Sequence, residues 1–70
     1  KQNDLAIADL TRAIKMNPKY MGAYLMRGAI YFDTKRYDLA KADLTKVIEL
    51  SPGNKLATDT LARIAVLAAP

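Results

Sequence analysis

Residues 21–54 of the 70-residue chain read MGAYLMRGAIYFDTKRYDLAKADLTKVIELSPGN, and the second part of this stretch repeats an earlier part of the chain. A shift of 34 residues places residues 1–20 over residues 35–54 without a gap, and ten of the twenty pairs are then identical. These pairs include Asp9 with Asp43 and Leu10 with Leu44. A fixed period of this length is typical of repeat proteins, in which successive units stack on one another. The sequence therefore predicts a repeat architecture.

The repeated unit also predicts helices. Its apolar residues recur at helical spacing, in Leu39, Ala40, Leu44, Val47 and Ile48. Proline disfavours the helical conformation of the residue before it, so helices are expected to end before Pro18 and Pro52. We expect four helices, at about residues 4–16, 22–33, 38–50 and 55–69, joined as antiparallel helix-turn-helix units in an all-α fold. In the last helix an apolar arc is expected from Leu56, Leu61, Ile64, Leu67 and Ala68.

Side chains that carry chemistry are scarce. The chain has no histidine and no cysteine, and its only serine, Ser51, lies in an expected turn before proline. The usual general bases, thiol nucleophiles and zinc ligands are therefore missing. The three glycines, Gly22, Gly28 and Gly53, are too far apart to form a phosphate-binding loop. We expect no catalytic, cofactor-binding or metal site, and we do not expect an enzyme.

The composition indicates a folded domain, with 51% apolar and 26% charged residues. The longest apolar stretch, residues 64–69, is too short to cross a bilayer, so no membrane partner is expected. The formal net charge is +4, but the eleven basic residues are scattered among seven acidic ones. Nucleic-acid binding requires basic residues gathered on one face, so nucleic acid is the less favoured partner.

Seven residues of 21–54 occupy the positions of a known repeat pattern: Tyr24, Arg27, Gly28, Tyr31, Ala40, Leu44 and Pro52. Four of them are the residues of the pattern, whereas tyrosine stands for tryptophan at 24, arginine for leucine at 27 and leucine for phenylalanine at 44. By these residues the stretch resembles one complete tetratricopeptide repeat, a helix-turn-helix with the pattern W-x2-L-G-x2-Y, then A-x3-F, then P. The stretch is similar to a family variant in which R-G in the first helix accompanies A-D-L-T in the second, here residues 42–45. The resemblance implies a second-helix half repeat at 1–20, a complete repeat at 21–54, and a degenerate first helix or capping helix at 55–70.

Gly28 indicates a close contact between the paired helices. Glycine inside a helix costs about 1 kcal/mol relative to alanine, so its presence is best explained by a neighbour that a Cβ would strike. The small side chain of Ala40 is expected to serve the same contact from the other helix. Tyr24 and Tyr31 lie on the side of Gly28 and are expected to fill the seam around it.

Arg27 replaces the leucine of the pattern and changes the chemistry of that position. In the variant that the chain resembles, this arginine accompanies an aspartate in the second helix. We therefore expect Arg27 to pair with Asp43, or with Asp9 of the preceding half repeat, at a helix seam. The pair is interpreted as structural rather than catalytic.

The first helix is expected to lack its natural cover on the face of Leu5, Leu10 and Ile14. Each large apolar side chain left in water forfeits roughly 1.5–3 kcal/mol. Two arrangements would supply the cover: further repeats upstream, or a second copy that packs against the chain or swaps terminal helices with it.

The resemblance implies that the first helix of each unit lines a concave groove that takes an extended or helical peptide. The residues of this face are Leu25, Met26, Ala29, Phe32, Asp33, Asp59, Arg63 and Val66. We expect a protein-interaction scaffold that binds an apolar or amphipathic peptide there. An alternative is that the apolar patch packs against the last helix or a second copy, which would make the chain a homo-oligomerisation module without a peptide ligand.

Some family members use lysine, arginine and asparagine on this face to clamp the C-terminal carboxylates of chaperones. In this chain the matching places hold Leu25, Met26, Ala29, Leu56 and Thr60. Because none of these side chains binds a carboxylate by charge, a chaperone tail is not the expected ligand.

Overall fold

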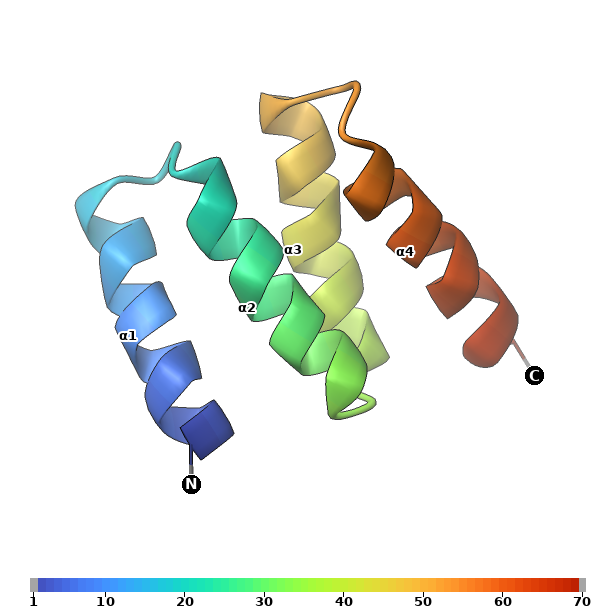
Figure 1. Cartoon of the computed structure of the whole chain (residues 1–70), viewed down its shortest axis with the longest axis horizontal. Coiled ribbons are helices and arrows are strands. Elements are labelled where there is room, and N and C mark those ends of the chain that lie inside the picture. The colour runs from blue at the N-terminus through green and yellow to red at the C-terminus, as the bar shows by residue number, and fades with distance from the viewer. Residues whose placement is uncertain (1, 70) are drawn as a thin grey trace.

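The computed structural model describes residues 2–69, and within them the chain forms four helices and no strand. The helices are α1 (Gln2–Met16), α2 (Met21–Asp33), α3 (Tyr37–Leu50) and α4 (Lys55–Leu67). They lie side by side in chain order, each antiparallel to the next (Figure 1). The predicted all-α fold of helix-turn-helix units is confirmed.

The predicted starts of α2 and α3 differ from the structure by one residue, and two other helix ends differ by two. α1 begins at Gln2 rather than near residue 4, because Gln2 and Asn3 continue the helix without adding to its apolar pattern. α4 ends at Leu67 rather than at residue 69, and the N–H of Ala68 closes it by donating to the carbonyl of Ile64 at 2.8 Å. Ala69 precedes a proline, a position that disfavours the helical conformation. Residues 1 and 70, at the outer limits of the predicted divisions 1–20 and 55–70, lie outside the described residues.

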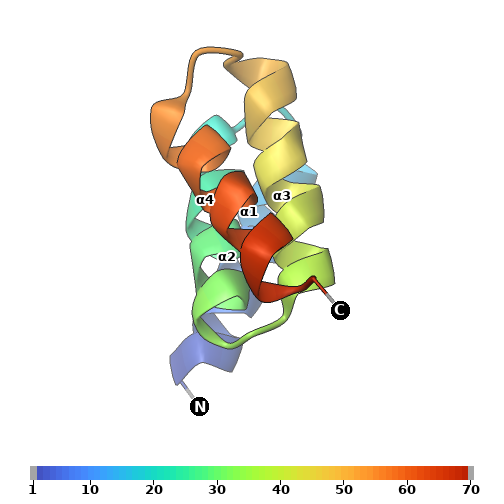
Figure 2. The same cartoon turned by 90° about the vertical axis from the view of Figure 1, so that its right-hand side faces the viewer.

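The core is centred on α3. α2 packs between α1 and α3, whereas the main contact of α4 is with α3. Seen along the array, α2 and the start of α4 lie on the same side of α3 (Figure 2). The cluster of buried apolar residues consists of Tyr24, Ala40, Leu44, Val47, Ala57 and Ile64. The molecule measures 35 × 30 × 14 Å, so it is a thin slab in which every helix keeps an exposed face.

The outer helices differ from expectation in how much apolar surface they cover. On α1, Leu10 and Ile14 are half-buried because they face α2, and of the three residues expected to lack cover only Leu5 is exposed. On α4, Ile64 is buried, but Leu56 and Leu67 from the same predicted arc are exposed. A helix that packs chiefly against one neighbour covers only a narrow part of such an arc.

The turn into α4 is held by a helix cap. The side-chain oxygen of Asn54 accepts a hydrogen bond from the N–H of Ala57 at 2.9 Å, which satisfies one of the free donors of the first turn. Asn54 also approaches α2, where its amide nitrogen lies 3.7 Å from the sulfur of Met21. This cap fixes where α4 begins relative to the repeat before it.

Candidate functional site

Arg27 joins three helices through its guanidinium group. Its Nε donates to Oδ2 of Asp43 at 2.8 Å and its Nη2 donates to Oδ1 of the same carboxylate at 2.7 Å. Its Nη1 donates to the hydroxyl of Thr11 on α1 at 3.0 Å. Of the two aspartates expected as partners, the structure therefore pairs Arg27 with Asp43, while Asp9 is exposed on α1.

The ion pair is shielded from solvent and fully hydrogen-bonded. The side chains of Arg27 and Asp43 are 18% and 5% exposed, and both carboxylate oxygens accept a bond from the guanidinium. The hydrogen bonds to Asp43 raise the pKa of Arg27 above its ordinary value, although burial opposes this shift. Folding thus favours the charged arginine, and this contribution is lost only as the pH rises through the raised pKa, far above neutrality. A carboxylate engaged in this way is suited to holding helices together and not to proton transfer.

Gly28 allows α3 to approach the cluster. A Cβ on this residue would lie 3.2 Å from the Cβ of Asp43 and 3.3 Å from side-chain atoms of Leu44. The close neighbours of Gly28 are thus Asp43 and Leu44 rather than Ala40, although Ala40 is completely buried in the same seam. Because Gly28 carries no side chain, Asp43 comes near enough for Arg27 to bind it with two hydrogen bonds.

The two tyrosines of the repeat pattern complete the junction. Tyr24 is buried, and its hydroxyl donates to the carbonyl of Pro18 in the turn between α1 and α2 at 2.9 Å. The guanidinium carbon of Arg27 lies 5.9 Å from the ring centre of Tyr31, within the range of a cation–π interaction. Thr11 is the member of this junction that sequence reasoning missed. Its signal was the identity of the D-L-T triplets at 9–11 and 43–45, which lie on the two helices flanking α2.

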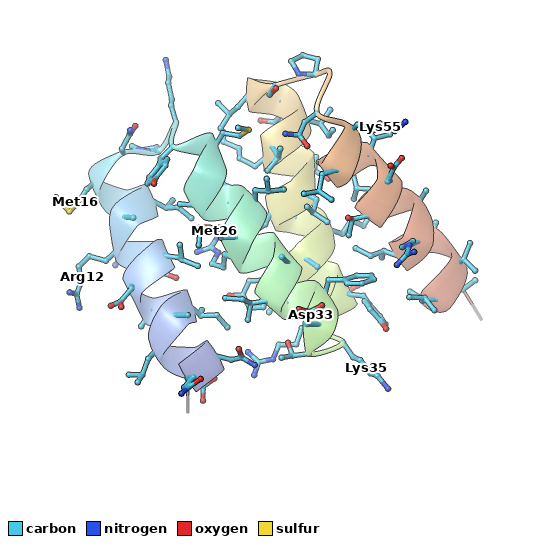
Figure 3. All side chains as sticks on the ribbon, in the orientation of Figure 1. Arg12, Met16, Met26, Asp33, Lys35 and Lys55 are labelled. Atoms are coloured by element: carbon cyan, nitrogen blue, oxygen red, sulfur yellow. The ribbon has the colours of Figure 1, made fainter. Side chains whose placement is uncertain are left out.

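The predicted interaction residues of α2 fall into two groups. Met26, Ala29 and Asp33 are exposed, and Met26 has 59% of its surface accessible. Leu25 and Phe32 are half-buried and pack against the core, and the ring centre of Phe32 lies 5.9 Å from that of Tyr37. Met26 and Asp33 can be located on α2 in Figure 3. The free part of this helix is therefore narrower than the predicted patch.

The predicted residues of α4, Asp59, Arg63 and Val66, are all exposed. Arg63 and Val66 line a shallow hollow together with Ala62 and Leu67. Ala62 and Leu67 were not among the predicted site residues, and helical spacing had assigned Leu67 to the apolar arc of this helix. Leu67 is 56% exposed and Val66 is 76% exposed, so α4 presents large apolar side chains to solvent.

No metal site is evident in the part of the chain that the structure describes: residues 2–69 contain no group of three histidine, cysteine, aspartate or glutamate side chains placed to hold an ion. Within the same range no helix is both long and apolar enough to cross a membrane.

These features define an all-helical repeat module in which a polar cluster joins three helices, and in which α2 and α4 keep exposed faces. Residues 22–54 match the family model described as Tetratricopeptide repeat, so the chain contains a tetratricopeptide repeat. Repeats of this family generally mediate protein–protein interactions and are typically non-enzymatic scaffolds. No curated protein and no solved structure matches the chain.

Proposed function

We propose that the chain is a non-enzymatic scaffold that binds an apolar or amphipathic peptide segment of a protein partner along the exposed faces of α2 and α4. The observation that supports this most strongly is Met26, a large apolar side chain that is 59% exposed on a helix packed against both of its neighbours. Helix faces of this kind commonly receive an amphipathic peptide.

The charges on the exposed faces of α2 and α4 suggest the chemistry of the peptide. Ala29 leaves room beside Met26, and Asp33 places a negative charge at the end of α2. On α4, Arg63 offers a positive charge beside Val66, and Asp59 offers a second negative one. A peptide with an apolar stripe, a basic residue near Asp33 and an acidic residue near Arg63 would complement this surface. A methionine adapts its shape to different apolar partners, which favours a groove with modest sequence requirements.

The size of the expected effect follows from the area that Met26 exposes. Burying a whole large apolar side chain contributes roughly 1.5–3 kcal/mol, so covering the exposed part of Met26 is worth about 1–2 kcal/mol. A charged residue at this position would lose that contribution and would also be desolvated by an apolar ligand. We therefore expect Met26→Glu to weaken peptide binding at least about tenfold.

The experiment selects peptides on the wild-type protein from a displayed random library and titrates each selected peptide by fluorescence anisotropy. Met16→Glu is the matched control, because Met16 is an equally flexible, 82% exposed methionine that projects from α1 away from α2 (Figure 3). We expect Met26→Glu to lose affinity and Met16→Glu to keep it. Selected peptides that bind both variants as tightly as the wild type would place the binding surface elsewhere and refute the proposal.

A further inference from the structure

α4 carries an exposed stripe with apolar residues at its ends and opposite charges between them: Leu56, Asp59, Arg63 and Val66. The intervals of three, four and three residues keep these side chains along one face of the helix. Leu56 is 61% exposed and Val66 is 76% exposed. Among residues 2–69, neither Asp59 nor Arg63 forms a salt bridge, so both charges face solvent without a partner.

The order of these residues is complementary to itself when the helix is reversed. In an antiparallel pair of α4 helices centred at the level of Leu61, Leu56 of one copy faces Val66 of the other. In the same register Asp59 of each copy faces Arg63 of the other. A twofold axis makes each of these contacts occur twice, as an isologous interface requires. Shifting the register by one helical turn would remove the charge pairing and leave the apolar ends unmatched.

The surface of α4 also provides a seat for the facing leucine. The hollow lined by Ala62, Arg63, Val66 and Leu67 lies at the level that Leu56 of the second copy reaches in this register. At the middle of the pair, Thr60 and Ala62 are small enough to let the helices approach closely. We infer that α4 is a self-association surface, on which two copies of the chain pair antiparallel through Leu56, Asp59, Arg63 and Val66.

The expected dimer is weak. A helix of 13 residues is about 20 Å long and about 10 Å wide, so the contact covers a few hundred Å² per partner. Stable protein–protein interfaces bury about 800 Å² per partner, and the α4 contact is well below this size. Self-association is therefore expected only at high protein concentration, where it would occupy Arg63 and Val66 and compete with a peptide for the α4 part of the proposed binding face.

α1 supplies an internal comparison, because it carries the related stripe Leu5, Asp9, Arg12 and Met16. Arg12 and Met16 project from α1 away from the other helices (Figure 3). α4 differs in having an apolar hollow and the exposed Leu67 directly beside its stripe, which is why the pairing is assigned to α4. Arginine can thus be replaced by aspartate on α1, at Arg12, or on α4, at Arg63, and the two variants can be compared.

The test measures sedimentation velocity of the wild-type chain, without any peptide, from about 10 μM to about 1 mM, the range in which weak interfaces associate. Arg63→Asp and Asp59→Arg each replace two attractive contacts by two repulsive ones, so each is expected to weaken self-association at least about tenfold. The double variant Asp59→Arg/Arg63→Asp reverses both charges and is expected to associate as the wild type does. Far-UV circular dichroism verifies that each variant folds.

A mixture of the two single variants gives the sharpest result. One variant has basic residues at both positions and the other has acidic residues at both, so they are expected to associate with each other although neither associates with itself. Arg12→Asp on α1 is the control and is expected to leave self-association unchanged. A wild-type chain that stays monomeric over the whole range, or a mixture that fails to associate, would overturn the inference. Met26→Glu, which tests peptide binding, is expected to leave self-association intact, so the two proposals fail independently.

Discussion

α2 and α4 occupy equivalent places one period of 34 residues apart, yet they hold their neighbours in different ways. Each carries a fully buried alanine at the equivalent position, Ala23 in α2 and Ala57 in α4. The residues that join α2 to two neighbours have no counterpart in α4, where leucine replaces Arg27 and alanine replaces Gly28. A buried alanine is thus common to the helix with two main neighbours and to the helix with one. The R-G pair occurs in the helix that packs on both sides.

The same difference separates α1 from α3, which also lie one period apart. Asp9 and Asp43 are identical residues at equivalent positions, but Asp43 is only 4% exposed and Asp9 lies on the surface. The helix with the R-G pair, α2, follows Asp9 in the chain and precedes Asp43. Arg27 of this helix binds Asp43, the aspartate that comes after it. A residue can therefore be repeated in the sequence and carry its structural role only once.

The largest effect is expected from breaking the ion pair. Asp43→Ala leaves Arg27 charged and largely buried without its carboxylate, and removing one partner of a buried pair typically costs 3–5 kcal/mol. Because Arg27 retains some access to water, we expect a loss of about 3 kcal/mol in the free energy of unfolding, measured by urea denaturation. Asp9→Ala is the matched control and is expected to change stability by less than about 0.5 kcal/mol. Equal losses of stability in both variants would mean that Arg27 does not favour Asp43 on α3 over Asp9 on α1.

A smaller effect is expected from filling the gap at Gly28. Gly28→Val introduces a Cβ that would lie 3.2 Å from the Cβ of Asp43, an atom attached directly to the backbone of α3. The helices must then separate, and overpacking of this kind typically costs about 2 kcal/mol. Ala62→Val makes the equivalent change on α4, where the position is exposed, and is expected to stay within about 0.5 kcal/mol of the wild type.

Thermal unfolding, followed by circular dichroism, measures the stability of the Gly28→Val and Ala62→Val variants. If Gly28→Val were as stable as Ala62→Val, the seam would tolerate a wider helix spacing than the contact distances indicate.

The fold was predictable because its determinants are local in the sequence. The 34-residue period, the prolines that end the helices and a glycine within a helix each act over a few residues, and they predicted all four helices and the seam at Gly28. The resemblance to the family variant narrowed the partner of Arg27 to two aspartates, Asp43 and Asp9. The choice between the two aspartates depends on how α2 crosses α1 and α3, and no local sequence pattern predicts this crossing.

The interaction surface was harder to predict because it depends on what each helix leaves uncovered. Leu25 and Phe32 have the spacing of an exposed patch, but the start of α3 brings Tyr37 against Phe32 and the core takes up both. Leu67 has the spacing of a core residue but remains exposed because α4 packs chiefly against one helix. Periodicity identifies the faces of a helix, whereas the number of its neighbours determines which faces stay free.

The smallest expected effect concerns the turn that joins α2 to α3. Lys35 has a φ of 62°, and among residues 2–69 no other residue has a positive φ. The turn forces it, because the N–H of Lys35 donates to the carbonyl of Phe32 and the N–H of Arg36 donates to that of Tyr31. A side chain with a Cβ is disfavoured by roughly 1–2 kcal/mol in this region, whereas glycine adopts it freely.

Lys35→Gly is therefore expected to stabilise the chain, by about 0.5–1 kcal/mol once the greater freedom of glycine in the unfolded state is subtracted. Lys35→Ala is the control, since it removes the charge and the long side chain but keeps the Cβ, and it is expected to leave stability nearly unchanged. Urea denaturation of both variants measures the difference. A gain in Lys35→Ala as large as that in Lys35→Gly would attribute the effect to the lysine side chain and not to the backbone of the turn.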